Sequence, residues 1–278
     1  MYTCPDCKTA LENLYCRECR HQYERVDGVP VLLSNEARFQ SVATSVGAYD
    51  SIYRSQTNVW ENQGRTPEFL QYFSGLLGQF PATRFLEVGC GEGFLHSKVQ
   101  AGEKFAVDLS VQALRAAQAK TQGQFSVALA ERLPFPAEYF DLVASVGVME
   151  HFLDDREAAR EIRRVLRPGG YYVCLVHVEV TSWERLGMKM SQFVFPIPRP
   201  LAFTRWFKEK VGGMGRREPE PAYVKQPIQN KYSTRTARAV LEQSTFNVLH
   251  VIHKRKQPDL PLEGHHVVIY VAQKPKAA

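Results

Sequence analysis

The sequence has no long apolar run, since no stretch of its 278 residues approaches the ~18 apolar residues that a membrane-spanning helix needs. Its beginning lacks a charged and then apolar segment of the kind that directs secretion. The net charge of +6 permits anionic partners without requiring them. A hydrophobic share of 44% is ample for a packed core. From these features together we expect a soluble, cytoplasmic protein with one full-size domain and a small module.

Cysteine is scarce, and four of the six cysteines form two C-x-x-C pairs near the start: Cys4 with Cys7, and Cys16 with Cys19. Four thiolates can close a tetrahedral metal site, and their softness favours zinc, with iron as an alternative. Two disulfides would need an oxidising compartment. The surrounding segment has few apolar residues, so a metal would supply much of its stability. The spacing predicts a structural Zn²⁺ site.

Two common nucleotide-binding patterns are missing from the glycine-rich segment that follows the apolar run 85–88. It lacks the G-x-x-x-x-G-K-[ST] of a phosphate loop, and its third glycine comes one residue earlier than in G-x-G-x-x-G. What it has is Gly89, Gly91 and Gly93 at alternate positions, directly after Glu87 and Val88. An acid before such glycines fits a cationic or hydroxyl-rich ligand better than a phosphate. The pattern favours a nucleotide-like cofactor at the carboxyl end of a parallel sheet.

A second expected strand ends in Asp108, 19 positions after Gly89. A carboxylate at that place can accept hydrogen bonds from both hydroxyls of a ribose. The alternation of strands and helices at short spacing predicts an α/β, doubly wound, mostly parallel sheet. Further strands are expected at 124–130, 140–146, 171–178, 246–253 and 265–271, and helices at 66–78, 110–117, 154–166 and 233–241.

Six short motifs follow one another: LEVGCGEG at 86–93, VDLS at 107–110, LPF at 133–135, FDLV at 140–143, MEH at 149–151 and LRPGG at 166–170. In this order and at these spacings they resemble the class I S-adenosylmethionine-dependent methyltransferases, in the branch of the quinone-biosynthesis enzymes. The resemblance spans about residues 49–178 and resumes at Tyr232. It implies a seven-stranded, Rossmann-like sheet whose last strand is antiparallel.

The resemblance also implies roles for single residues. The glycines would let the backbone approach the methionine and ribose of S-adenosylmethionine, and Asp108 would bind the ribose hydroxyls. In one departure from the family, Leu129 stands where an Asp often meets the adenine amino group, so a backbone carbonyl takes over or adenine is held more loosely. The cofactor-binding residues expected from the resemblance are Glu87, Gly89, Gly91, Gly93, Asp108, Leu109, Ala130, Glu131 and Ser145.

The expected chemistry is displacement of an activated methyl group by an acceptor aligned behind it. An oxygen acceptor usually needs a base, and His151 after the fourth strand is the first candidate, with His177 at the end of the fifth as the second. Glu150 and His151 can also serve only to shape the turn. Motifs for amide, exocyclic-amine or pyrimidine-carbon methylation are absent. We therefore expect a small or amphiphilic metabolite as acceptor, with O-methylation favoured.

The expected domains are a zinc ribbon at 1–34, a linker or lid at 35–65, and a methyltransferase domain at 66–278 with a cap insertion at 181–231. The ribbon resembles the short zinc proteins that activate certain methyltransferases. Aromatic and basic residues interleave at 193–210, which suits a packed cap, a peripheral membrane contact or, less well, RNA.

Two alternative functions stay open. One is methylation of ribosomal RNA, because some enzymes of that class also carry an N-terminal zinc module. The other is a non-catalytic scaffold that binds the cofactor and docks a partner through the zinc ribbon. The intact glycine loop and Asp108 argue against a scaffold.

Overall fold

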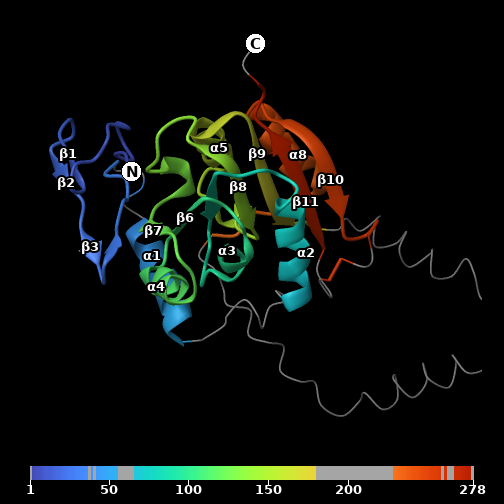
Figure 1. Cartoon of the computed structure of the whole chain (residues 1–278), viewed down its shortest axis with the longest axis horizontal. Helices are drawn as coiled ribbons and strands as arrows, with labels where there is room; N and C mark the ends of the chain where they lie inside the picture. Colours follow the sequence, from blue (N-terminus) through green and yellow to red (C-terminus); the bar gives the residue numbers. More distant parts are fainter. Residues whose placement is uncertain are drawn as a thin grey trace, which may run out of the picture. The chain divides into compact units, whose positions relative to one another are not determined.

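A computed structural model of the protein describes residues 2–36, 39, 42–55, 66–179, 228–257, 260–261 and 266–276 (Figure 1). Its centre is a seven-stranded sheet with the strand order β10-β11-β9-β8-β5-β6-β7. The strands are β5 (Arg84–Val88), β6 (Glu103–Asp108), β7 (Gln124–Val127), β8 (Phe140–Val146), β9 (Leu166–His177), β10 (Asn247–His253) and β11 (Val267–Gln273).

The pairing of the strands confirms the predicted sheet. Strands β5 to β9 are parallel, and β11 lies antiparallel between β9 and β10. The chain runs from β5 outward through β6 to β7, then returns to place β8 on the other side of β5. The strand order therefore reverses between β5 and β8. In open α/β sheets, ligands bind outside the carboxyl ends of the strands at such a switch point.

Helices cover both faces of the sheet, as a doubly wound fold requires (Figure 1). On one face, α2 (Pro67–Leu77), α3 (Phe94–Lys98) and α4 (Val111–Lys120) bury apolar side chains. On the other face, α5 (Asp155–Val165) and α8 (Thr234–Gln243) pack through residues such as Ile162 and Leu241. Successive strand residues alternate between the two faces, as Phe105 and Ala106 do.

Helices α2, α4 and α8 begin where the sequence predicts, because the side chain before each first turn accepts a hydrogen bond from a free backbone N–H. Thr66 caps α2, Ser110 caps α4 and Ser233 caps α8. The predicted start of the fifth strand at residue 171 is wrong: β9 begins at Leu166. Helix α5 does end before the Pro-Gly-Gly segment, at Val165, and that segment forms an irregularity within the strand, where Gly169 has a φ of 79°.

The N-terminal module consists of two small hairpins, β1 (Tyr15–Cys16) with β2 (His21–Gln22), and β3 (Arg25–Val26) with β4 (Val29–Pro30). The second hairpin turns at Asp27 and Gly28, with φ positive at both. Val31 then forms a parallel bridge to Val127 of β7, the edge strand of the sheet. The module therefore covers an edge that would otherwise expose unpaired backbone groups.

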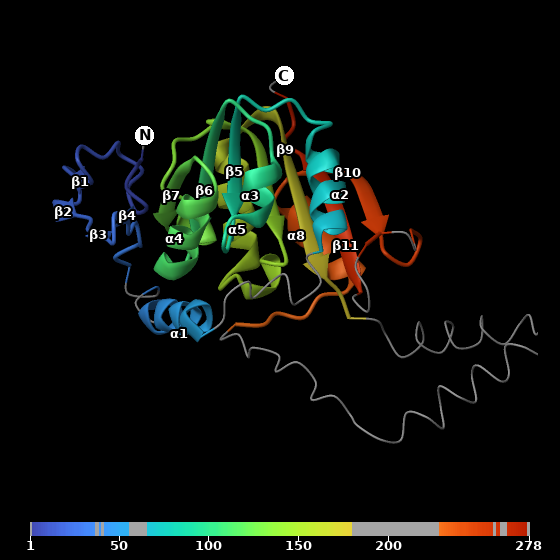
Figure 2. The ribbon, with the colours of Figure 1, turned by 60° about the horizontal axis from the view of Figure 1, so that its bottom comes forward.

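Helix α1 (Val42–Ser55) packs beside α4 (Figure 2). The predicted membrane contact at 193–210 lies outside the described residues, as does the predicted cap insertion up to residue 227. No helix among the described residues is both long enough and apolar enough to cross a bilayer.

Candidate functional site

A pocket opens at the carboxyl ends of β5, β6 and β8, where the strand order reverses. It encloses about 750 Å³ of space between atoms, including open solvent at its mouth. Its walls come from the ends of these strands, from α1, and from two short 3₁₀ turns, η3 (Ala130–Arg132) and η4 (Met149–His151). The lining residues are Val42, Tyr49, Tyr53, Val88, Gly89, Val107, Asp108, Leu109, Ala128, Leu129, Ala130, Glu131, Gly147, Val148, His151, Phe152, Leu153 and Ile228.

The three alternate glycines serve different purposes in the structure. Gly89 lines the pocket with a φ of 70°, and a Cβ atom there would lie 2.4 Å from a methyl group of Val148. Gly91 donates its backbone N–H to Asp108 Oδ2 at 2.8 Å. Gly93 caps α3 with a φ of 73°, and a Cβ atom would lie 2.8 Å from Cβ of Ala117 in α4. Of the three glycines, Gly89 alone is among the described residues that line the pocket.

Asp108 ends β6 and faces the pocket. Its carboxylate accepts hydrogen bonds from the backbone N–H groups of Gly91, at 2.8 Å, and of Ser110, at 3.0 Å. Burial raises the pKa of Asp108, and these two hydrogen bonds oppose the shift. A carboxylate has about four acceptor sites, so these bonds leave acceptor capacity for a hydroxyl group of a ligand.

Helix α1 brings two tyrosines to the pocket. Tyr49 and Tyr53 both line it, and the side chain of Tyr49 is only 9% exposed. The buried Tyr49 hydroxyl has no hydrogen-bond partner among the described residues, and burial together with the charge of Asp108 raises its pKa. The helix is held in place by Asp50, whose Oδ1 accepts from Ser110 Oγ at 2.6 Å. The predicted lid thus has its described part at the pocket, and its closing role stays a prediction.

Three more of the expected cofactor-binding residues, Leu109, Ala130 and Glu131, line the pocket. Leu129 lines the pocket beside them, at the position where the family often has an Asp. Glu131 lines the pocket too, but its Oε1 accepts from the backbone N–H groups of Leu153, at 2.7 Å, and of Asp154, at 3.2 Å. Burial raises the pKa of Glu131, against the effect of these bonds. Its carboxylate therefore links η3 to the segment that follows η4.

Of the two candidate bases, the structure brings only His151 to the pocket. Its Nδ1 lies 2.6 Å from the carbonyl oxygen of Ile228. A carbonyl oxygen only accepts, so Nδ1 carries the hydrogen and the lone pair is at Nε2. Burial lowers the pKa of His151, which favours the neutral ring. His177 is half exposed, and its Nδ1 and backbone N–H both contact Oε1 of Glu150.

Two other predicted cofactor residues lie apart from the pocket lining. The Glu87 side chain is 1% exposed, and its Oε2 is 3.4 Å from Nδ1 of the fully buried His96 in α3. Because Val88 faces the pocket, alternation along β5 directs Glu87 to the other face. Ser145 is buried and its hydroxyl is 2.8 Å from that of Tyr172.

Sequence reasoning missed several walls of the pocket. Val148 and Phe152 flank the predicted MEH motif, and their proximity to it could have been a signal. Ile228 comes from the far end of the insertion, and no local pattern points to it.

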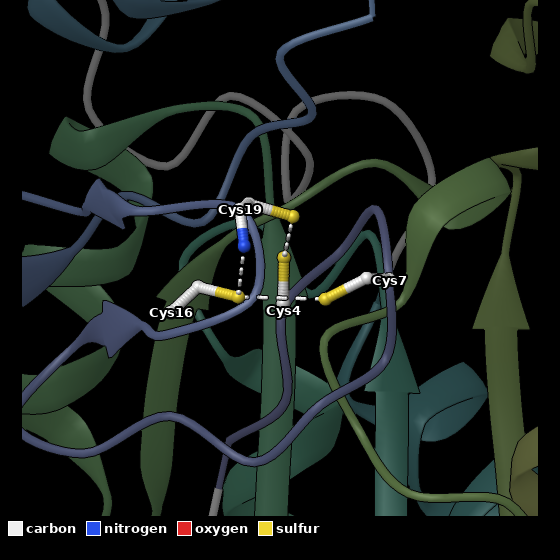
Figure 3. Close-up of side chains that lie close together, drawn as sticks. All are labelled: Cys4, Cys7, Cys16 and Cys19. Carbon is white, nitrogen blue, oxygen red and sulfur yellow. Dashed lines mark hydrogen bonds between the residues drawn. The ribbon is translucent and has the colours of Figure 1, made fainter.

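The four N-terminal cysteines meet as predicted (Figure 3). Their sulfur atoms all lie within 4.8 Å of one another, with 3.4 Å between Cys7 and Cys16 and 3.8 Å between Cys4 and Cys19. All six cysteines of the chain are free thiols. Four sulfurs at about 2.3 Å from one tetrahedral Zn²⁺ would be about 3.8 Å apart, so the cluster fits a single ion.

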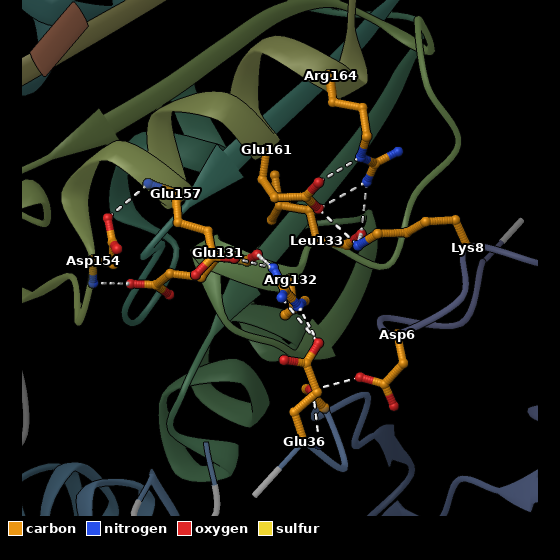
Figure 4. Close-up of polar contacts among 11 residues, drawn as sticks. Asp6, Lys8, Glu36, Glu131, Arg132, Leu133, Asp154, Glu157, Glu161 and Arg164 are labelled. Carbon is orange, nitrogen blue, oxygen red and sulfur yellow. Dashed lines mark hydrogen bonds and ion pairs between the residues drawn. The ribbon is translucent and has the colours of Figure 1, made fainter. Parts of the chain in front are cut away.

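Charged side chains join this module and its linker to the turn that lines the pocket (Figure 4). Arg132, directly after Glu131, contacts Glu36 of the linker at 2.9 Å and Glu157 of α5 at 2.5 Å. Lys8, next to Cys7, contacts Glu161 of α5 at 2.8 Å. Arg132 thus ties the η3 turn both to the linker and to α5.

Comparison with known proteins assigns the domain. Residues 86–174 match the methyltransferase domain family. The chain is 31% identical over 135 residues to the 2-methyl-6-phytyl-1,4-hydroquinone methyltransferase of Arabidopsis thaliana. This alignment covers 46% of this chain and 39% of the relative. It is 31% identical over 119 residues to the demethylmenaquinone methyltransferase of Bacillus licheniformis, covering 40% and 50%.

A solved structure supports the fold. The 1,6-didemethyltoxoflavin-N1-methyltransferase of Burkholderia thailandensis, with bound S-adenosylhomocysteine, superposes with a TM-score of 0.55 at 17% identity, covering 87% of this chain and 92% of that one. The match to the two curated relatives spans half of their length or less. Residues 86–174 thus carry a methyltransferase domain, and the sheet with its switch point has the fold expected for the class I S-adenosylmethionine-dependent enzymes.

Proposed function

We propose that this chain transfers the methyl group of S-adenosylmethionine to a small, uncharged and largely apolar aromatic acceptor with a phenolic hydroxyl. The observation that carries the proposal is the pocket at the switch point, which Gly89 and Asp108 line together. A hydroxyl-accepting carboxylate next to an apolar wall suits a nucleoside joined to an apolar co-substrate.

The residues present fit the cofactor. Asp108 has free acceptor sites for the ribose hydroxyls, and Leu109 and Ala130 offer an apolar surface to adenine. The buried Tyr49 hydroxyl can donate a hydrogen bond to the cofactor, which would satisfy a polar group that has no partner among the described residues. When bound, the cofactor supplies an electrophilic methyl group.

The chemistry of the remaining walls defines the acceptor. None of the described lining residues is Lys or Arg, and the charged groups among them are Asp108 and Glu131. An anionic acceptor such as an RNA phosphate would therefore meet like charges. The names of both curated relatives point to quinol-type substrates, which are uncharged and mostly apolar.

His151 is the proposed base. Its Nε2 lone pair can take the phenolic proton as the acceptor attacks the methyl group. Loss of that proton makes both the oxygen and the neighbouring ring carbons nucleophilic, and we propose the oxygen as the methylated atom.

The four cysteines are proposed to hold one structural Zn²⁺, because four sulfur ligands fit a closed tetrahedral site with no position left for a substrate. A cytoplasmic location, where free thiols persist, is part of the same proposal.

A transfer assay tests the function. The zinc-loaded full chain is incubated with methyl-labelled cofactor and either a prenylated 1,4-naphthohydroquinone or total cellular RNA. We expect label in the extracted quinol, and mass spectrometry of the product locates the methyl on oxygen or carbon. At a cofactor concentration below saturation, Asp108→Ala should lower transfer strongly, while Glu103→Ala, at the exposed start of the same strand, should not. Label in RNA alone would overturn the acceptor, and cofactor binding without transfer to any pool would favour a scaffold.

A further inference from the structure

A short segment at the end of the insertion, residues 228–232 (the 228–232 strap), is hydrogen-bonded along the turn that carries His151. The backbone N–H of Asn230 donates to the carbonyl of Glu150 at 2.7 Å. Its side-chain Nδ2 donates to the carbonyl of Phe152, also at 2.7 Å. One asparagine therefore binds the residue before His151 and the residue after it.

The strap also fixes the imidazole ring itself. His151 Nδ1 donates to the carbonyl of Ile228 at 2.6 Å, two residues before Asn230. Farther along, the Tyr232 hydroxyl donates to Asp155 at 2.7 Å, and the Tyr232 carbonyl accepts from the N–H of Glu179 at 2.7 Å. The strap is thus anchored at both of its own ends, with Asn230 in the middle.

We propose that Asn230 is a positioning residue that holds His151 with Nδ1 protonated and the Nε2 lone pair turned to the methyl acceptor. Asn230 is not among the described residues that line the pocket, so its effect passes through His151. The inference rests on the proposed function. In the step it serves, the acceptor oxygen forms a bond to the methyl carbon, the carbon–sulfur bond breaks, and the phenolic proton moves to Nε2.

The charged groups around His151 fit a ring that is neutral before the step. Glu150, on its own turn, favours the imidazolium, whereas His177 of β9 disfavours it. Asp108 of β6 and Glu131 of η3 share the pocket, and Tyr49 and Tyr53 of α1 are the other titratable groups there. Burial outweighs the favourable contributions and lowers the pKa of His151.

The tautomer is tested without any activity measurement. Nitrogen-15 NMR of histidine-labelled, zinc-loaded full chain distinguishes Nδ1–H from Nε2–H, and His151→Gln assigns the signal. We expect the Nδ1–H form in the wild type and a mixture in Asn230→Ala. The control is Ser233→Ala, which removes one side-chain hydrogen bond to a backbone N–H at the start of α8, next to the strap, without touching His151. An Nε2–H wild type, or an Asn230→Ala spectrum identical to the wild type, would overturn the proposal.

Kinetics with the prenylated naphthohydroquinone then tests the role. A general base typically raises the rate about 10²–10⁴-fold. Because Asn230→Ala leaves His151 less well held, it should lower kcat about tenfold and change KM less than about twofold. The acidic limb of its kcat–pH profile should also shift to lower pH. The bond to Ile228 raises the pKa of His151, and this bond is weakened in the variant. Ser233→Ala should keep kcat within about twofold. Equal losses in both variants would reduce Asn230 to a structural role. An absence of wild-type turnover would defeat the proposed function, while the NMR result would still decide whether Asn230 sets the tautomer of His151.

Discussion

The Gly89→Ala variant offers the sharpest test of the cofactor loop. Gly89 has a φ of 70°, and a Cβ atom built on it would lie 2.4 and 2.6 Å from the two methyl groups of Val148. Two separate costs follow, one from the backbone conformation and one from the overlap. A left-handed conformation costs a non-glycine residue about 1–2 kcal/mol. Overpacking in a tight site costs about 1–3 kcal/mol.

We therefore expect Gly89→Ala to lower the free energy of unfolding by about 2–5 kcal/mol. The overlap can be removed separately, since Val148→Ala deletes both methyl groups. In that background Gly89→Ala should cost only the conformational part, about 1–2 kcal/mol. Gly28 is the matched control, because its φ is 84° and a Cβ atom there would meet nothing within 4 Å.

The assay is urea unfolding of the zinc-loaded chain, with calorimetry of S-adenosylhomocysteine binding on the same samples. The affinity should fall at least about tenfold in Gly89→Ala, because Val148 is a pocket wall that the new methyl group displaces. It should recover in part in the double variant. If Gly89→Ala costs the same in both backgrounds, or no more than Gly28→Ala, the close approach of the loop to Val148 is refuted.

Three further predictions concern the metal, the lid tyrosine and pH. Elemental analysis should find one zinc per chain, and Cys16→Ser, which removes a fully buried sulfur, should release it and expose the module to protease; retained zinc would contradict the site. Tyr49→Phe removes a buried hydroxyl without a described partner, so stability should change by less than about 0.5 kcal/mol, while affinity for S-adenosylhomocysteine should fall about 5–10-fold; unchanged affinity would remove the hydroxyl from the site. The folded pKa of Asp108 is raised above its ordinary 3.8, so the unliganded fold loses stability as pH rises through that pKa, and cofactor affinity is lost as pH falls through it. Titration of binding in Asp108→Asn should lack this acidic loss.

Much of the fold could be predicted because local signals agree with it. Thr66, Ser110 and Ser233 cap helices as their residue types favour, and apolar runs mark the strands of the sheet. The helix stop before Pro168 and Gly169 is confirmed, but the start of β9 at Leu166 is not visible in the sequence, because both residue types disfavour a strand. Pairing with β8 and β11, which is a tertiary effect, extends the strand through them.

The site was predictable where the carboxyl ends of parallel strands bring residues together. Gly89, Asp108 and His151 follow three different strands and line one pocket. Glu87 lies off the pocket because side chains alternate along β5, which the motif alone does not express. Asn230 and Ile228 could not be found from sequence, since a long insertion separates them from the turn they contact.

The most direct measurement is calorimetric titration of the zinc-loaded full chain with S-adenosylhomocysteine, in the wild type and in Asp108→Ala. Loss of hydrogen bonds to a charged group costs about 1–3 kcal/mol, so the variant should bind about 5–150-fold more weakly at a single site. Equal affinity of the two proteins, or no heat of binding in the wild type, would contradict the assignment of this pocket to the cofactor.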